Sequence, residues 1–390
     1  MRIAIVAHSA YPSEPRNRRM AEALNAAGYE ITVICLQQSD QAPDETVNGV
    51  HVVRLPVVHS QGAGAAASVK EYARFFWLAG IQLRRQHRRR PFALVQVHNP
   101  PDALAFCTVP VKLRGVPVVL DLRELTPELF MSRFSLARRS AVVRGLTVLE
   151  RWACAYADAV LVLHDRHRGI MLGRGVPARK LTQVMNCPDE RLFDPGKVPS
   201  HRPSDGRFVV IYHGGIVYRY GIDLLVEAVA HARQDIPGIQ LEFYGSGDLL
   251  PEIERLVKQR DLTKIVNLHG IQPLEAMAAA IASSDVGVAP MRQDVFTDCV
   301  LPTKLLEYVA LGLPTIAART NTTADYFDES MVLLHTPGDA ADLAAKLLEV
   351  YRNPTAAQAR AECARGFTLA HNWRGESAAY LHLIRQLTGA

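Results

Sequence analysis

The sequence DVFTDCVLPTKLLEYVALGLPTIAA, residues 294–318, decides the fold that we predict for this chain. It follows a short apolar run, DVGVAP, that is typical of a buried strand. Pro302 suits the start of a helix, Gly312 suits its end, and LPTIAA returns as a second buried strand. The pattern predicts a strand, a long loop, a helix and a strand. Because open α/β sheets bind ligands at the carboxyl ends of their strands, the loop and the helix N-terminus form a candidate ligand site.

Two polar residues of this helix have the spacing that a nucleotide site needs. Lys304 lies in the first turn, where free N–H groups and the positive end of the helix dipole attract a phosphate. Glu307 lies one turn deeper on the same face, where a carboxylate can accept hydrogen bonds from a ribose diol. An amphipathic surface helix with an ordinary ion pair explains the spacing equally well, so the residues alone leave both interpretations open.

The same segment carries a family resemblance. PTKLLEYVALGLPTIA, residues 302–317, resembles the donor-binding segment of the family 4 glycosyltransferases. The resemblance implies an α/β fold of the GT-B type, in which two Rossmann-like domains face a central cleft and the C-terminal helix crosses back to the first domain. It also implies that the anomeric configuration of the transferred sugar is retained.

Many members of that family carry two glutamates eight residues apart in this segment. The second corresponds to Glu307, which by resemblance binds the ribose. The first, which contacts the donor sugar, falls on Cys299, and the adjacent Asp298 is a candidate to replace it. Whether Asp298 or Cys299 takes that contact stays open. We also expect Thr303 and Leu305 to bind the donor.

Length and composition favour a protein of two domains. The chain has 390 residues, 48% of them hydrophobic, which suits two globular cores. No apolar stretch approaches the roughly 20 residues of a membrane-spanning helix. The six cysteines are scattered without metal-ligand spacing, which is typical of free thiols in a reducing compartment. We therefore expect a cytoplasmic protein without a bound metal.

The charge is distributed unevenly along the chain. Residues 1–200 carry 27 Lys and Arg against 17 Asp and Glu, whereas residues 201–390 carry 17 against 22. The first half is therefore basic although the net charge is only +5. This asymmetry predicts that the first half faces an anionic partner.

The first half of the chain alternates apolar runs with helical segments. The predicted strands are RIAIVA, YEITVIC, HVVRLPVV, ALVQV, VPVVLDL and AVLVLH. Runs of Val, Ile and Leu without polar alternation indicate a parallel sheet covered on both faces. The loop after the first strand, AHSAYPSEPRNRR, has no glycine, so it lacks the dinucleotide fingerprint. Dehydrogenase chemistry is therefore not expected for this half.

The second half repeats this alternation beyond a linker. Residues 189–207 have the Pro, Gly, Ser and charge content of a linker. The strands predicted after it are FVVIYHG, IQLEFYG, IVNLHG, DVGVAP, LPTIAA and MVLLH. We predict an acceptor-binding domain over residues 1–193, joined by a C-terminal helix at about 372–390, and a nucleotide-sugar-binding domain over 205–371. VMNCPDERLF, residues 184–193, resembles the family signature at the end of the first domain.

The loop HGGIVYRYGID, residues 213–223, follows the first strand of the second half. Gly214 and Gly215 allow the backbone to approach a ligand closely. Family members usually place an arginine and a lysine in this loop to bind the diphosphate. Arg219 is the remaining cation here, and by resemblance to an R-Y-G variant of the family it is predicted to bind phosphate. A solvated loop arginine is the alternative.

Two further loops of the second half resemble donor-binding segments. Gly245 and Gly247 in YGSGD follow the next strand, and by resemblance they lie beside the nucleotide. Ile271 and Gln272 in HGIQP take the position at which family members contact the base through their backbone. Neither loop supplies a side chain that would identify the base.

The first half holds the other candidate residues. By resemblance of HNPPD to a family segment, His98 meets the donor sugar across the interdomain cleft, while a strand-end histidine bound by its neighbours is the alternative. DLRELTPELF, residues 121–130, resembles a loop that lines the acceptor side. The residues predicted to bind the acceptor are Arg16, Arg123, Glu124 and Glu128.

KEYARFFWLAGIQLRRQHRRR, residues 70–90, joins an aromatic helix to five arginines. A helix on the surface of an anionic membrane would have this composition. A core helix with a solvated basic end would share it, and both interpretations stay open. No nucleic-acid reader motif accompanies the arginines, so we expect no nucleic-acid partner.

Together these observations predict a cytoplasmic retaining glycosyltransferase, and a peripheral position on the inner face of a membrane stays open. It would move a sugar from a nucleotide diphosphate sugar, its co-substrate, to a saccharide or lipid-linked acceptor in surface glycan assembly, with no cofactor. Glycosylation of a small-molecule natural product, and epimerisation of a nucleotide sugar on the same fold, are the alternatives. The residues predicted to be catalytic are His98, Arg219 and Lys304.

Overall fold

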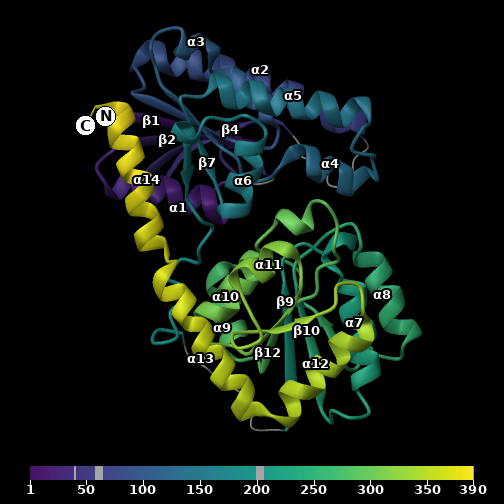
Figure 1. Ribbon diagram of the computed structural model, residues 1–390. Coiled ribbons are helices and arrows are strands. Elements are labelled where there is room, and N and C mark those ends of the chain that lie inside the picture. The colour runs from purple at the N-terminus through teal and green to yellow at the C-terminus, as the bar shows by residue number, and fades with distance from the viewer. Residues whose placement is uncertain (39–40, 58–64, 199–205, 390) are drawn as a thin grey trace. The chain divides into compact units, whose positions relative to one another are not determined.

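The computed structural model describes residues 1–38, 41–57, 65–198 and 206–389 (Figure 1). Contacts within the chain divide it into two units: Met1–Asn186 with Arg374–Ala390, and Cys187–Trp373. The boundary thus falls at Asn186, a few residues before the predicted one. Part of the predicted linker, residues 199–205, lies outside the described residues.

The first unit is built on an eight-stranded sheet with the order β3-β4-β2-β1-β5-β6-β7-β8. All neighbouring strands run parallel except β3 and β4, which form a hairpin. The strands are β1 (Arg2–Ala7), β2 (Glu30–Leu36), β3 (Asp44–Val47), β4 (Val50–Leu55), β5 (Leu94–His98), β6 (Val118–Asp121), β7 (Ala159–Val162) and β8 (Leu181–Gln183).

Six of these strands confirm the prediction, and β3 and β8 are additional. The apolar run predicted through Val58 ends as β4 at Leu55, and Val58 itself lies outside the described residues. The sequence pattern did not predict β3, because its residues, DETV, are mostly exposed and polar. The turn that closes its hairpin, Asn48-Gly49, has positive φ at both positions, which is the ordinary turn of a two-residue hairpin.

Helices cover the faces of this sheet (Figure 1). They are α1 (Pro15–Ala26), α2 (Ala65–Arg89), α3 (Val109–Lys112), α4 (Thr126–Phe134), α5 (Ala141–Tyr156), α6 (Asp165–Gly173) and α14 (Trp373–Thr388), with the short helices η1 (Asp102–Thr108) and η2 (Ala178–Lys180). The C-terminal helix α14 belongs to the first unit, as predicted. Its Tyr380 hydroxyl donates to Gln96 Oε1 of β5 at 2.6 Å. None of the described helices has both the length and the apolar content to cross a bilayer.

The second unit is built on a six-stranded parallel sheet with the order β11-β10-β9-β12-β13-β14. All six strands confirm the prediction. They are β9 (Phe208–His213), β10 (Ile239–Tyr244), β11 (Val266–Leu268), β12 (Val286–Ala289), β13 (Thr315–Ala318) and β14 (Leu333–His335). The helices are η3 (Tyr218–Tyr220), α7 (Ile222–Ala232), α8 (Leu250–Gln259), α9 (Leu274–Ala282), η4 (Thr297–Cys299), α10 (Thr303–Ala310), α11 (Asn321–Tyr326), α12 (Ala340–Arg352) and α13 (Pro354–Ala370).

The helix α10 packs directly on the sheet. It begins after Pro302 and ends before Gly312, whose φ of +67° suits a glycine. The ring of Tyr308 lies on β12, so close that a Cβ built on Gly287 would come within 2.5 Å of it. This contact fixes the first turns of α10 at the carboxyl edge of the sheet.

Candidate functional site

Lys304 lies in the first turn of α10 and is 7% exposed. Its ammonium is 4.9 Å from the centroid of the Tyr212 ring and 4.8 Å from that of Tyr220. In the part of the chain that the structure describes, no carboxylate lies within ion-pair distance of it. Burial lowers the pKa of Lys304 to about 8, although Glu307 opposes the shift. A buried cation with two aromatic neighbours and no acid partner is suited to bind an anion.

Arg219, on η3, lies against the same ring. Its guanidinium carbon is 5.2 Å from the centroid of Tyr220 and 5.4 Å from that of Phe296. Its Nε is buried and has no hydrogen-bond partner among the described residues. The N–H of Arg292 donates to the carbonyl of Arg219 at 3.0 Å and so holds η3 to the loop after β12. Two cations therefore lie against one ring, and neither forms an ion pair with a carboxylate of the described chain.

The glycines after β9 bring backbone next to these cations. Gly214 has a φ of +118°, and a Cβ built there would lie 3.5 Å from Lys304 Nζ. A Cβ on Gly215 would lie 3.5 Å from the Tyr220 ring. The backbone of this turn therefore lies beside Lys304 and the Tyr220 ring, where glycine leaves no side chain in the way.

The packing of neighbouring loops requires glycine at positions 245 and 247, after β10, and the sequence did not reveal this requirement. A Cβ on Gly245 would fall 1.9 Å from the carbonyl oxygen of Gly214. A Cβ on Gly247 would fall 2.1 Å from that of Ile216. These glycines let the loops after β9 and β10 pack against each other. The loop after β11 also contacts them, since the Gly245 N–H donates to the carbonyl of Gly270 at 2.7 Å.

Glu307 has a partner that sequence analysis missed. Its carboxylate lies 3.0 Å from His213 Nε2, at the end of β9, and Glu307 is 7% exposed. The His213 ring packs edge-on against Tyr308 at 5.3 Å. The position of His213 at the carboxyl end of a predicted strand was the feature of the sequence that could have indicated this contact. The contact orients the carboxylate at the same edge of the sheet as Lys304.

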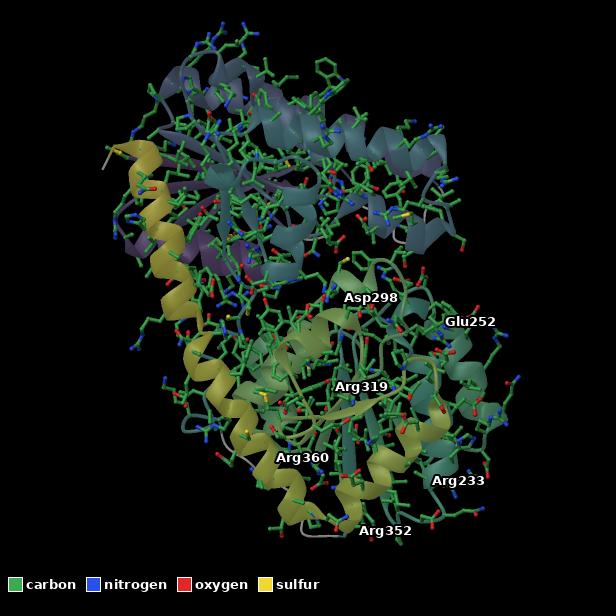
Figure 2. The ribbon with its side chains drawn as sticks, viewed as in Figure 1. Arg233, Glu252, Asp298, Arg319, Arg352 and Arg360 are labelled. Atoms are coloured by element: carbon green, nitrogen blue, oxygen red, sulfur yellow. The ribbon has the colours of Figure 1, made fainter. Side chains whose placement is uncertain are left out.

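The loop before α10 is organised by its acids. Asp298 accepts hydrogen bonds from the Gln293 side chain at 3.0 Å and from the N–H of Asn321 at 3.1 Å. Cys299 donates from Sγ to the carbonyl of Val295 at 3.3 Å. Figure 2 shows Asp298 at the end of the unit opposite to Arg233 and Arg352. A contact of Asp298 with a donor sugar remains a prediction.

The other predicted donor residues differ in exposure. Ile271 is 75% exposed, and the Gln272 side chain donates to the carbonyl of His269 at 2.8 Å. Thr303 is exposed at the start of α10. The side chain of Leu305 is fully buried, and its role in donor binding stays a prediction. Its N–H, in the first turn of the helix, is the group that could meet a ligand.

In the first unit, His98 does not present a free nitrogen. Its Nδ1 lies 2.8 Å from Asp121 Oδ2 and its Nε2 lies 2.8 Å from Gln96 Nε2. The side chain is 1% exposed, and Tyr380 of α14 holds the far end of Gln96. Both ring nitrogens of His98 therefore lie against protein groups of the first unit, and its contact with a donor sugar stays a prediction. The alternative, a strand-end histidine bound by its neighbours, is what the structure contains.

Two of the predicted acceptor residues are also buried in ion pairs. Arg16 donates to both oxygens of Asp121 at 2.8 Å and is 1% exposed. Glu128 is paired with Arg174 at 2.5 Å and is almost fully buried. Both side chains hold ion pairs within the first unit, and their contact with an acceptor stays a prediction.

The other two lie at the carboxyl end of β6 and are partly exposed. Arg123 pairs with Glu14 at 2.8 Å. The Asn99 side-chain oxygen accepts from the N–H groups of Arg123 and Glu124 at 2.7 and 3.2 Å. Asn99 thus fixes the backbone of this loop, and Arg123 and Glu124 remain candidates for acceptor binding. Among the described residues, no group of His, Cys, Asp and Glu gathers where it could hold a metal ion.

Both halves of the chain match known families. Residues 13–187 match the glycosyl transferase 4-like domain, and residues 207–353 match the glycosyl transferases group 1.

Two relatives of known activity are similar in sequence. The chain is 24% identical over 180 residues to a subunit of phosphatidylinositol N-acetylglucosaminyltransferase from Arabidopsis thaliana, a match over 46% of this chain and only 38% of that protein. It is 24% identical over 320 residues to alpha-D-kanosaminyltransferase of Streptomyces kanamyceticus, covering 77% of this chain and 80% of that protein.

Solved structures share the fold at low sequence identity. Sucrose-phosphate synthase of Thermosynechococcus elongatus has a TM-score of 0.77 at 20% identity, over 100% of this chain and 99% of that one. HepE of Anabaena, solved with UDP-glucose, has a TM-score of 0.73 at 14% identity, over 99% and 100%. At this level of identity, the likenesses show the fold alone.

Proposed function

Because this chain belongs to the family 4 glycosyltransferases with the GT-B fold, we propose that it transfers a sugar from a nucleotide diphosphate sugar with retention of configuration. Glycosyl transfer is the activity of the family. The donor class is supported by HepE, a structural relative that binds UDP and UDP-glucose. The acceptor would be a hydroxyl group.

The observation that carries the proposal is the pair of cations at Tyr220. The leaving diphosphate gains negative charge as the bond to the sugar breaks. Lys304 and Arg219, which have no acid partner in the described chain, would stabilise that charge together with the first-turn N–H groups of α10. Glu307, oriented by His213, would accept hydrogen bonds from the ribose. His98 is buried and takes no part in this scheme.

These cations would also fulfil the task that a divalent metal performs in other transferases. The Arg219 guanidinium and the Lys304 ammonium would together place two positive charges beside the diphosphate. We propose that transfer proceeds without a metal ion. Turnover that is unchanged in excess chelator would support this, and an absolute need for added Mn²⁺ or Mg²⁺ would contradict it.

For the acceptor, we propose a saccharide or lipid-linked saccharide of surface glycan assembly, at the cytoplasmic face of a membrane. The basic first half of the chain supports an anionic partner. A small-molecule acceptor is the second candidate, and the match with alpha-D-kanosaminyltransferase over most of both chains favours it.

Melting temperatures measured with UDP, GDP, ADP and dTDP would test the donor proposal first. One of them should stabilise the chain clearly, because a ligand that binds the folded state alone raises its stability. A folded chain that none of them stabilises would contradict the proposal. Incubation of the matching donor sugar without acceptor then separates a transferase, which hydrolyses it slowly, from an epimerase, which converts the sugar.

A further inference from the structure

One face of the first unit exposes an unusual number of large apolar side chains. Sixteen large apolar side chains are exposed in the described chain. Eight of them lie on the helices α2, α3 and α5 or on Leu113, the residue that follows α3. They are Val69, Trp77, Ile81, Val109, Leu113, Val142, Val148 and Trp152. Such a concentration on a water-exposed surface marks an interaction site.

α2 contacts α3, and α2, α3 and α5 all pack against η1, so the three helices lie around η1 on one part of the first unit (Figure 1). α2 and α3 bury their inner sides, such as Phe75 and Val111, in one core against the sheet. α2 approaches η1 closely at Gly80, where a Cβ would lie 3.2 Å from the Cys107 carbonyl. Tyr156, at the end of α5, packs on Phe106 of η1 with ring centroids 5.1 Å apart. We call the outer side of α2, α3 and α5 the three-helix surface.

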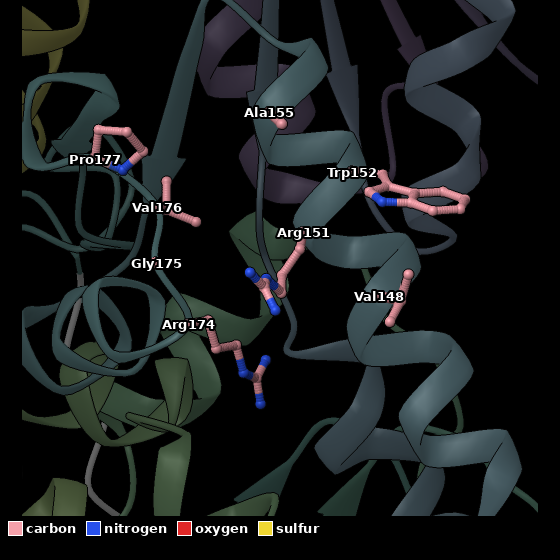
Figure 3. Close-up of a pocket in the computed structure, with 8 residues that line it drawn as sticks. All are labelled: Val148, Arg151, Trp152, Ala155, Arg174, Gly175, Val176 and Pro177. Carbon is pink, nitrogen blue, oxygen red and sulfur yellow. The ribbon is translucent and has the colours of Figure 1, made fainter.

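The exposed apolar side chains of α5, Val148 and Trp152, border a hollow of about 320 Å³ (Figure 3). Val148 and Trp152 stand one helical turn apart, and Val176 and Pro177 line the opposite wall. Arg151 points into the gap between the two walls (Figure 3). Trp152 is 64% exposed. This part of α5 therefore combines a large exposed aromatic side chain with a cation beside it.

The three-helix surface is also strongly basic. Exposed cations on these helices include Lys70, Arg74, Arg84, Arg85, Arg88, Arg89, Arg144 and Arg151. The two acids of the helices do not offset them at the surface. Glu71 contacts His8 at 2.9 Å with a side chain that is 9% exposed, and Glu150 is buried against Arg174.

We propose that the three-helix surface docks on an anionic lipid bilayer, with α5 contributing alongside α2. Trp, Val, Ile and Leu side chains enter the boundary between headgroups and acyl chains, while the arginines face lipid phosphates. A second copy of the chain would bring the same cations against each other, which costs free energy. A nucleic acid would satisfy the arginines but leave the aliphatic side chains in water. The proposal goes beyond donor binding and does not depend on it.

Sedimentation of the full chain with lipid vesicles tests the proposal. We expect binding to vesicles of phosphatidylcholine with 30% phosphatidylglycerol, little binding to phosphatidylcholine alone, and a loss of binding at high salt. The double variant Arg144→Gln/Arg151→Gln should weaken binding about 25-fold, at about fivefold for each arginine. The matched control Arg233→Gln/Arg352→Gln, on the second unit, should bind like the unaltered chain. Thermal unfolding checks that both variants are folded.

Tryptophan emission gives an independent readout, because the chain has three tryptophans and Trp373 is 8% exposed. Anionic vesicles should shift the emission to the blue, and Trp152→Phe and Trp77→Phe should each remove part of the shift. The proposal is overturned if anionic and neutral vesicles bind equally, if the α5 variant binds like its control, or if Trp152→Phe leaves the shift intact. Self-association or RNA binding through this surface, without vesicle binding, would also overturn it.

Discussion

Lys304 and Arg219 lie against the same aromatic ring, at 4.8 and 5.2 Å from the centroid of Tyr220. They come from different loops, since Arg219 precedes α7 and Lys304 opens α10. Neither cation forms an ion pair with a carboxylate among the described residues, and burial lowers the pKa of Lys304 although Glu307 opposes the shift. An anionic ligand would offset the cost of burying the ammonium, and that expectation underlies the predictions below.

Binding of a nucleoside diphosphate should weaken as the pH rises through about 8. Burial lowers the pKa of Lys304 to about 8 in the free protein, so the ammonium loses its proton above that value. The diphosphate favours the protonated form, and its affinity therefore falls on the alkaline side. Calorimetric titrations from pH 6.5 to 9.5 measure this, and Lys304→Arg, which stays charged, should flatten the profile. A flat profile for the unaltered chain would contradict the assignment.

Glu307 should favour a ribonucleotide over the same nucleotide without ribose hydroxyl groups. If its carboxylate accepts from the ribose diol, Glu307→Gln should weaken binding of the ribonucleotide about tenfold, as expected for a hydrogen bond to a charged group. The same variant should hardly change the binding of the 2′,3′-dideoxy analogue. Equal losses for both nucleotides would show that Glu307 acts elsewhere.

Gly247→Ala should destabilise the second unit although it removes no contact. The new Cβ would fall 2.1 Å from the Ile216 carbonyl, so the two loops must separate at a cost of about 1–3 kcal/mol. The control is Gly145→Ala on α5, where nothing lies within 4 Å of the new Cβ and alanine favours a helix by about 1 kcal/mol. Urea unfolding compares them, and similar effects of the two substitutions would contradict the packing described.

Asp121→Ala should destabilise the first unit by about 3–5 kcal/mol, because it leaves the buried guanidinium of Arg16 unpaired. Glu14→Gln, which breaks the more exposed pair with Arg123, should cost about 1 kcal/mol or less. Urea unfolding again provides the measurement. If Asp121→Ala changed acceptor binding but not stability, Arg16 would belong to the acceptor site after all.

Local pattern predicted the sheets and the helix that opens at the edge of the second sheet, because those features depend on residues near each other in the chain. Apolar runs located all six strands of the second unit, the helix pattern selected Lys304 and Glu307 as candidates, and the family resemblance selected Arg219. The missed partner His213 stood at the end of such a strand, and the shared ring of Tyr220 lay within the predicted R-Y-G segment.

The contacts of the first unit that the sequence did not predict join residues far apart in the chain. Arg16 meets Asp121 across 105 residues of sequence, and Tyr380 meets Gln96 beside His98 across 284 residues. No local pattern distinguishes a polar side chain that faces a ligand from one that faces a distant partner. The folded unit reveals these distant partners, which the sequence alone does not.

The central claim is tested most directly by the affinity for the nucleoside diphosphate that stabilises the chain most. Calorimetry should compare the unaltered chain with Lys304→Met, Arg219→Gln and the control Arg352→Gln. Each site variant is expected to weaken the diphosphate about 10- to 100-fold while the nucleoside alone is little affected, and the control should leave both unchanged. Site variants that remain folded and bind the diphosphate as tightly as the unaltered chain would contradict the claim.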